Sequence, residues 1–400
     1  MRKIKRNSAK KTFVVIFEAL NEHLTKDVGS IPYVLARDYG YDSYLVCHDI
    51  GQKFSNEYAL QFLKIIKLKP IKHLQSDNFR KFYFISYLYF LLRNAKNIDI
   101  MQFYHNSMVS NAMAFAYKTL NPNGFVYLKL DSNGIASGKE TKNTYLKIVR
   151  SLRKTVKKIF KKSFDLISVE TKKVYDNLKE HSPEWEGKLI HIPNGVDFEL
   201  LKSLGFEHPQ ETAKEKVIIT VARIGLKYKN NRMMLDALNG LDLKGWKFVF
   251  IGPVEHSFES EIENFYSLNP QLKESVIFTG AINDRKVLYS WYKKAKAFCL
   301  TSTYEKSSLP CENFSLAMTD SLYFGCEIIS TPIVCFDDLT NQNEFGYSVG
   351  NADGLRDILE KIITGEINLP ANMDKIIKYG NSFSWRDICK KIHTEINLRI

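Results

Sequence analysis

The sequence predicts an α/β protein built from two doubly wound, Rossmann-like domains that face each other across a cleft. The chain has 400 residues, which is more than one hydrophobic core usually serves. Short apolar runs alternate with longer helical patterns from end to end, as in parallel sheets with crossover helices. Residues 1–200 hold 33 basic and 19 acidic side chains (net +14), whereas residues 201–400 hold 24 and 25 (net −1). This contrast favours two domains with different partners.

The first half alternates strand and helix candidates. Each strand candidate is a short run rich in β-branched and aromatic side chains, and each helix candidate carries apolar residues three and four apart. Strands are expected at 13–17, 43–47, 99–103, 125–130, 166–169 and 189–192, and helices at 29–39, 56–67, 78–96, 107–119, 141–162 and 171–180.

The second half repeats the same alternation. A last helix, expected at 384–397, closes the chain. The other elements are strands at 217–222, 247–251, 276–279, 297–300, 327–330 and 333–335, and helices at 230–239, 259–267, 284–295, 314–324 and 353–363.

A domain boundary is expected near residues 200–215. This segment carries Gly205, Pro209 and a cluster of charges, and a new apolar strand begins at Val217. Polar linkers of this kind commonly separate compact domains. The expected domains are 1–205 and 206–383, with the C-terminal helix 384–400 packing back on the first.

Composition and cysteine usage exclude several classes of protein. With 44% hydrophobic and 25% charged residues, the chain is not disordered, collagen-like or a coiled coil. The six cysteines show neither Cys-x-x-Cys nor zinc-finger spacing, so we expect buried thiols in a reducing compartment. No apolar run reaches the roughly 20 residues that span a bilayer, and the basic start lacks a signal-peptide pattern. The expected location is cytoplasmic, or peripheral on the inner face of the cell membrane.

The loop after the strand 217–222 has the pattern of an anion-binding site. It reads Val221-Ala-Arg-Ile-Gly-Leu-Lys-Tyr-Lys-Asn-Asn231 and leads into a helix. A helix N-terminus offers free amides and the positive end of a dipole, to which Arg223 adds a fork and Lys229 a point charge for phosphate oxygens. A solvated basic loop has the same pattern, so both interpretations stay open.

Two carboxylates lie eight residues apart around the helix that follows the strand 297–300. Glu312 stands at the helix start and Asp320 within the helix, a spacing that puts them on nearby faces. Carboxylates accept hydrogen bonds from the hydroxyls of a sugar or a ribose. A carboxylate beside a helix N-terminus is also a common cap, and that alternative stays open for Glu312.

Together, motifs in the second half resemble the retaining glycosyltransferases of family 4, which have the GT-B fold of two Rossmann-like domains. The likeness covers about 189–395; over 1–185 it is limited to the strand–helix order and a glycine after the first strand. The motifs are Ile192-Pro-Asn-Gly-Val-Asp197, Val221-Ala-Arg…Lys229-Asn, Phe250-Ile-Gly-Pro253, Phe278-Thr-Gly-Ala281, Glu312-Asn-Phe-Ser-Leu…Asp320…Gly325 and Phe383-Ser-Trp385.

The resemblance implies a role for each matching residue. Arg223 and Lys229 would hold the diphosphate of a UDP- or GDP-sugar, and Glu312 would touch the donor sugar. Asp320 would bind the ribose hydroxyls where the family has a second Glu, and the turn 279–282 would receive the base. The other residues expected to contact the nucleotide are Gly29, Gly252, Ala281, Ile282 and the amides of Phe314, Ser315 and Leu316.

In the first half, the resemblance suggests residues near the acceptor. Gly29 and Ser30 would offer bare amides close to the diphosphate. His105 would orient the acceptor hydroxyl and complete the catalytic set of Glu312, Arg223 and Lys229. A packed or solvent-bound His105 is the alternative. Asp131 stands near the place where many relatives have a histidine, so its role is open.

The stretch 139–162 has the pattern of a basic amphipathic helix. It holds ten Lys or Arg and one acidic residue, with apolar side chains at helical spacing. It is expected either to meet an anionic membrane surface or to be a solvated face over the core. The aromatic run Phe79–Leu92 could lie at the interface beside it, although burial in the core is expected there.

The predicted function is transfer of a hexose-type sugar, with retention, from a nucleotide-diphosphate-sugar to a lipid-linked saccharide in bacterial surface polysaccharide synthesis. The resemblance implies no metal or other cofactor, and no Asp-x-Asp motif occurs. The alternatives are a soluble transferase acting on a protein or small molecule, and a non-catalytic partner subunit. Nucleic-acid binding is disfavoured because no helix-turn-helix, RNA-recognition or zinc signature is present.

Overall fold

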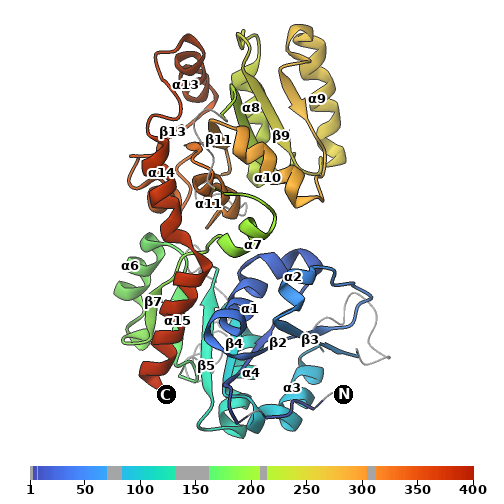
Figure 1. Cartoon of the computed structure of the whole chain (residues 1–400), viewed down its shortest axis with the longest axis vertical. Coiled ribbons are helices and arrows are strands. Elements are labelled where there is room, and N and C mark those ends of the chain that lie inside the picture. The colour runs from blue at the N-terminus through green and yellow to red at the C-terminus, as the bar shows by residue number, and fades with distance from the viewer. Residues whose placement is uncertain (1–2, 7, 70–82, 132–161, 208–213, 304–311) are drawn as a thin grey trace, which may run out of the picture. The chain divides into compact units, whose positions relative to one another are not determined.

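The computed structural model describes residues 3–6, 8–69, 83–131, 162–207, 214–303 and 312–400. The expected basic helix 141–162 therefore lies almost entirely outside the described residues. The chain divides into two compact units, Met1–Pro193 with Trp385–Ile400, and Asn194–Ser384. Both units are α/β with parallel sheets, as the alternation of strands and helices predicts (Figure 1).

The first unit is built on a parallel sheet in the order β3-β2-β1-β4-β5-β6-β7. The chain runs outward from β1 in one direction and then restarts at β4 in the other, which is the doubly wound arrangement. Its strands are β1 (Thr12–Ile16), β2 (Asp42–His48), β3 (Leu63–Leu68), β4 (Ile100–Tyr104), β5 (Phe125–Leu130), β6 (Leu166–Val169) and β7 (Leu189–His191).

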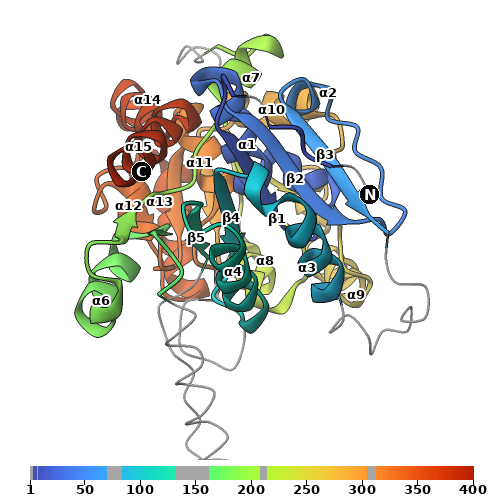
Figure 2. The same ribbon diagram turned by 90° about the horizontal axis from the view of Figure 1, so that it is seen from below.

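Helices cover both faces of this sheet (Figure 2). On one face, α1 (Asp27–Tyr39) and the last helix α15 (Trp385–Arg399) share a core with the inward side chains of the strands. On the other face lie α3 (Tyr83–Asn94) and α4 (Met108–Leu120), which pack against each other. The C-terminal helix thus belongs to the first unit, because Trp385, Ile388 and Ile392 are part of its core.

The expected helix 56–67 is wrong over most of its length. Only α2 (Glu57–Leu60) is helical, capped by Asn56, and the chain then forms the edge strand β3. Leu63, Ile66 and Leu68 are buried while the lysines between them are exposed. A spacing of three between buried residues reads as helical in isolation, and pairing with β2 decides for a strand.

The second unit has a parallel sheet in the order β10-β9-β8-β11-β12-β13. One face packs against α8 (Asn231–Leu238), α9 (His256–Leu268) and α13 (Ala352–Thr364). The other packs against α10 (Arg285–Lys294), α11 (Leu316–Tyr323), α12 (Phe336–Thr340) and α14 (Met373–Gly380). The strands are β8 (Val217–Val221), β9 (Lys247–Ile251), β10 (Val276–Phe278), β11 (Ala297–Leu300), β12 (Glu327–Ser330) and β13 (Gly346–Ser348).

The expected strand 333–335 is also wrong. Ile333 and Cys335 are buried in the core ahead of α12 without forming a strand. The edge strand is instead β13, which pairs with β12 through Gly346, Tyr347 and Ser348. The sequence misled because β13 consists of Gly346, Tyr347 and Ser348, which are not a typical apolar strand, whereas the loop with Ile333 and Cys335 is apolar.

The first boundary between the units lies at Pro193, earlier than the expected Gly205. The short helix α7 (Phe198–Ser203) explains the difference. Val196 and Leu201 are buried in the core of the second unit, and Val196 forms a parallel bridge with Ser384. Because these contacts lie within the second unit, the linker residues before Gly205 fold with it.

Two further features concern the side chains and the helices. The described cysteines are free thiols, and all of them are buried: Cys47, Cys299, Cys326, Cys335 and Cys389. Among the described residues, no helix is both long and apolar enough to cross a membrane.

Candidate functional site

The candidate site lies between the neighbouring strands β8 and β11, where the order in which the chain adds strands to the second sheet reverses. From β8 the chain continues outward to β9 and β10, and from β11 it continues outward to β12 and β13. The loops that leave the carboxyl ends of β8 and β11 therefore diverge, which is where doubly wound sheets bind their ligands. Lys229 and Thr301 follow these two strands.

Lys229 and Glu312 form an ion pair at this place. Lys229 ends a 3₁₀ turn (Lys227–Lys229) after β8, and its Nζ donates to Glu312 Oε2. Each side chain is only 13% exposed. Ser302 Oγ, from the loop after β11, donates to the same carboxylate oxygen over 3.2 Å. The sequence proposed both residues for the site, and the structure brings them together.

Hydrogen bonds join the loops that hold this pair. The Thr303 amide donates to the Tyr228 carbonyl over 2.8 Å, and Thr301 Oγ1 donates to the Asn230 carbonyl over 3.0 Å. Thr331, after β12, donates from its hydroxyl to the Ser302 carbonyl over 2.6 Å. The ends of three strands are thus linked through backbone carbonyls, so the Lys229–Glu312 pair stands on a supported frame.

Arg223 pairs with Glu255 rather than with Glu312. Its Nη2 donates to Glu255 Oε1 over 2.6 Å, and the arginine side chain is 64% exposed. The loops after β8 and β9 run side by side here, since the Ile224 amide donates to Pro253 and the Glu255 amide to Ile224, each over 2.9 Å. Sequence reasoning missed Glu255, because no motif distinguishes it from an ordinary surface acid.

Gly252 follows β9 at a point where no side chain fits. Its φ is 139°, and a Cβ would lie 1.8 Å from the Ala222 carbonyl oxygen. Its amide donates to the Gly280 carbonyl over 3.0 Å, which ties it to the turn after β10. In that turn Ala281 is exposed and Ile282 packs against the core. The glycine thus allows close packing of the loops after β8, β9 and β10.

The N-terminus of α11 is capped by Ser315, not by Glu312. The Ser315 hydroxyl accepts from the Met318 amide over 3.3 Å, and the helix begins at Leu316. The capping interpretation of Glu312 is therefore wrong. The Ser315 amide hydrogen-bonds the Cys335 thiol, whose pKa burial raises.

Other amides at this helix end are open. Those of Phe314, Leu316 and Ala317 have no hydrogen-bond acceptor within the described part of the chain. The end of α11 thus offers donors and a positive dipole end close in sequence to Glu312.

Asp320 lies on α11, four residues after Leu316 and on the same side of the helix. Burial raises the pKa of Asp320 to about 7, although the nearby Arg285 opposes the shift. Its charge in turn raises the pKa of the buried Tyr289 and Tyr292, which are already raised by their own burial. Near neutral pH, Asp320 can therefore both donate and accept hydrogen bonds.

In the first unit, the expectation of bare amides at Gly29 and Ser30 is wrong. Both amides donate to the Lys26 carbonyl, over 3.1 and 2.8 Å, within the first turn of α1. Gly29 instead meets a packing demand, because a Cβ there would lie 2.3 Å from the carbonyl oxygen of Leu24, in the preceding 3₁₀ turn (Asn21–Thr25).

Lys129 forms a buried ion cluster that sequence reasoning missed. Its ammonium contacts Asp27 Oδ2 at 3.1 Å and donates to Glu170 Oε1, and the lysine side chain is fully buried. Burial alone would lower the pKa of Lys129, but the two carboxylates raise it. For the carboxyl group of Glu170 burial acts in the opposite direction and raises the pKa. A lysine inside an apolar strand is the signal that could have revealed this cluster.

His105 and Asp131 follow β4 and β5. His105 is exposed, has a φ of 59°, and its amide donates to the Lys129 carbonyl over 3.1 Å. Its ring lies 6.1 Å from that of Phe17, which follows β1. The negative charge of Asp131 helps to raise the pKa of Glu170. His105 is therefore accessible to a ligand at the carboxyl edge of the first sheet.

Comparison with known proteins identifies the second unit. Residues 205–380 match the family described as glycosyl transferases group 1. This match covers the Lys229–Glu312 pair, Arg223, Gly252 and Asp320. No curated protein matches the chain by sequence.

Solved structures match almost the whole chain. Sucrose-phosphate synthase from Thermosynechococcus elongatus has a TM-score of 0.68 at 15% identity, over 96% of this chain and 98% of that one. Anabaena HepE in complex with UDP gives 0.67 at 13%, over 97% and 99%. The lipopolysaccharide outer core galactosyltransferase WaaB gives 0.66 at 16%, over 97% and 100%. The fold is thus GT-B, and with the group 1 domain the chain is a glycosyltransferase.

Proposed function

We propose that this glycosyltransferase binds a nucleotide-diphosphate-sugar on its second unit and transfers a hexose-type sugar with retention to a saccharide acceptor. The observation that carries the proposal is the Lys229–Glu312 ion pair, which lies between the ends of β8 and β11. Lys229 supplies a cation that would bind the diphosphate, and Glu312 supplies a carboxylate that would accept hydrogen bonds from sugar hydroxyls. The open amides at the start of α11 add anion-binding donors.

Donor binding would separate the Lys229–Glu312 ion pair and give each side chain a new partner. Lys229 would turn from Glu312 to the diphosphate, and the released carboxylate would accept hydrogen bonds from the sugar. Arg223, exposed beside Glu255, would add its fork to the phosphate oxygens. As the bond to the sugar breaks, negative charge grows on the diphosphate, so these cations and the dipole of α11 would stabilise the transition state.

Retention and the remaining donor contacts rest on the resemblance to family 4. Glu312 and Asp320 keep the spacing of that family's paired acids, with Asp in the second place. Asp320 would then hold the ribose, and the turn with Ala281 and Ile282 the base. Anabaena HepE binds UDP and UDP-glucose, which supports a uridine donor, and a GDP-sugar is the alternative.

We further propose a lipid-linked saccharide as the acceptor, in the synthesis of a surface polysaccharide. The net charge of +14 over residues 1–200 suits a lipid diphosphate or an anionic membrane surface. The basic stretch 139–162 would contribute most of it. A structural relative acts on lipopolysaccharide, which is a saccharide carried on lipid. His105 would orient the acceptor hydroxyl.

Donor binding and stereochemistry can be tested in sequence. UDP-glucose, UDP-galactose, UDP-N-acetylglucosamine and GDP-mannose are screened by thermal shift, because a ligand that binds only the native state raises the melting temperature. The best donor is then used with saccharide acceptors, and the product's anomeric proton coupling is measured by NMR. A retained α-configuration supports the proposal, and an inverted product overturns its stereochemistry.

A further inference from the structure

The helices α3 and α4 expose large apolar side chains to solvent. On α3, Tyr89 is 45% and Leu92 61% exposed, and on α4 Met108 is 46% and Phe115 44% exposed. Burial in the core, expected for the run Phe79–Leu92, holds for Tyr87, Phe90 and Leu91 but not for this second set. The exposed side chains, which we call the α3–α4 face, are Phe84, Ile85, Tyr89, Leu92, Met108, Val109 and Phe115.

These side chains form stripes along two adjacent helices. At 100° per residue, Ile85, Tyr89 and Leu92 fall within about 60° of one another, and Met108 and Phe115 are similarly aligned. The two helices pack together on one side of the first sheet, as both ribbon views show (Figures 1 and 2). Large apolar side chains gathered on two adjacent helices, rather than scattered singly over a surface, favour a docking site.

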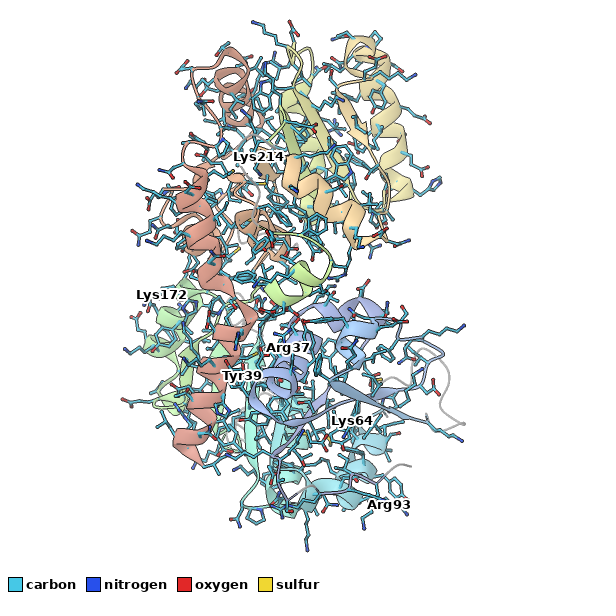
Figure 3. All side chains as sticks on the ribbon, viewed as in Figure 1. Arg37, Tyr39, Lys64, Arg93, Lys172 and Lys214 are labelled. Carbon is cyan, nitrogen blue, oxygen red and sulfur yellow. The ribbon has the colours of Figure 1, made fainter. Side chains whose placement is uncertain are left out.

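The exposed charges on the two helices are basic. Neither α3 nor α4 contains an acidic residue. Lys118 of α4 is paired with Asp165 at 2.7 Å, so the cations that face solvent without a described partner acid are at the end of α3. Arg93 and Lys96 are exposed at the C-terminal end of α3. The Arg93 guanidinium lies 4.8 Å from the centre of the Tyr89 ring, at the outer edge of the unit (Figure 3). The face is therefore apolar, aromatic and basic.

We propose that the α3–α4 face docks on an anionic lipid bilayer. Tyrosine and phenylalanine suit the boundary between headgroups and acyl chains, and exposed Lys and Arg suit anionic headgroups. A protein partner would need its own acids to match the cations, whereas an anionic leaflet supplies them everywhere. The inference rests on the proposed function in one respect, since a lipid-linked acceptor would be presented at such a surface.

Vesicle sedimentation without donor tests the apolar part of the face. The full chain is mixed with vesicles of phosphatidylcholine, or of phosphatidylcholine with phosphatidylglycerol. The variant Tyr89→Ser/Leu92→Ser is compared with Leu268→Ser/Leu398→Ser, which removes two exposed leucines from other helices. We expect the first pair to weaken partition into anionic vesicles by roughly tenfold or more, and the second pair to leave it unchanged.

A second pair of variants tests the charges. Arg93→Gln/Lys96→Gln is compared with Lys390→Gln/Lys391→Gln, which removes two exposed lysines from α15. We expect only the first pair to weaken binding at low salt, and high salt to remove that difference.

Other results would overturn the inference. Equal binding of all variants would leave the α3–α4 face without a role at the membrane, and so would equal binding to both kinds of vesicle. Sedimentation equilibrium showing a dimer that Tyr89→Ser/Leu92→Ser breaks would assign the face to a second copy. Donor binding is measured on the same preparations by thermal shift, so failure of the docking face and failure of the donor site are told apart.

Discussion

The Lys229 ammonium lies against the Glu312 carboxylate, between the ends of β8 and β11, the two strands at which the strand order of the second sheet reverses. Ser302 holds the same carboxylate from the loop after β11. The pair is mostly shielded from solvent, so neither charge is screened as a surface charge would be. In the proposed function, a diphosphate would displace the carboxylate from Lys229, and Glu312 would then be free to accept hydrogen bonds from the sugar.

Removing either cation should slow sugar transfer. Lys229→Ala and Arg223→Ala are each expected to lose about 2–4 kcal/mol of transition-state stabilisation, because each removes a charge that, in the proposed function, would stabilise the leaving diphosphate. The measurement is kcat/KM for donor turnover. Wild-type kcat/KM in the double variant would remove the diphosphate from this loop.

The two substitutions should differ in their effect on folding. Lys229→Ala leaves the Glu312 carboxylate without its cation in a shielded place, so we expect a loss of roughly 1–3 kcal/mol in the free energy of unfolding. Arg223→Ala breaks an exposed pair with Glu255, which is worth about 0–1 kcal/mol. Urea unfolding of both variants measures the difference, and equal losses would contradict the assigned environments.

Glu312→Gln should lower turnover while the fold and nucleotide binding persist. The amide keeps the shape of the side chain and an oxygen for Ser302 and Lys229, but it loses the charge that would accept the sugar hydroxyls. The matched control is Glu255→Gln, which neutralises the other carboxylate that is paired with a cation of the site. We expect kcat to fall about 100-fold or more only for Glu312→Gln. A similar kcat for both variants would contradict a role for Glu312 at the sugar.

Gly252→Ala should destabilise the second unit strongly. The added Cβ would meet the Ala222 carbonyl oxygen at 1.8 Å, and its φ of 139° disfavours a side chain in any case. We expect a loss of about 3 kcal/mol or more in the free energy of unfolding. In the control Gly240→Ala, φ is also positive but no atom lies within 4 Å, so a loss of about 1 kcal/mol is expected. Equal losses would show that backbone conformation alone, not the contact with Ala222, sets the requirement.

Asp320 should make stability fall as pH rises. Its folded pKa of about 7 lies above the ordinary value of 3.8, so the native state binds the proton more tightly than the unfolded chain. The stabilisation is complete below about pH 4 and is lost as pH rises to about 7, by up to roughly 4 kcal/mol.

The variant Asp320→Asn isolates this contribution. Because it cannot ionise, it should lack this part of the pH dependence, and its stability relative to wild type should rise between about pH 4 and pH 7. Glu170, whose pKa is also raised, is present in both proteins and cancels in the comparison. Parallel stability curves, measured by urea unfolding across this range, would contradict the raised pKa of Asp320.

The sequence predicted interior strands better than edge strands. Strands such as β1, β5 and β11 are buried on both faces, so their apolar runs are continuous. Two of the four edge strands, β3 and β13, lack this signal, because lysines interrupt the first at 64 and 67 and the second is three residues long. The other two, β7 and β10, were predicted at 189–192 and 276–279. The pairing of β3 with β2 and of β13 with β12 is a tertiary contact that no local pattern records.

The candidate site was predictable where a motif and a strand end coincide. Lys229 and Glu312 satisfied that condition, and the structure places them in contact. Glu255 and the Lys129 cluster did not, because each depends on partners from distant parts of the chain. Gly29 was proposed from its place after the first strand, and the structure gives a packing reason for a glycine there, because a Cβ would lie 2.3 Å from the Leu24 carbonyl oxygen.

The central claim is that Lys229 holds the diphosphate of the donor, and calorimetric titration tests it most directly. UDP, GDP and the corresponding monophosphates are titrated into the wild-type chain and into Lys229→Ala. We predict that one diphosphate binds the wild type and loses about tenfold or more in affinity in the variant, while its monophosphate binds both alike. Equal affinity of that diphosphate for the two proteins, or no binding of either diphosphate to the wild type, would contradict the claim.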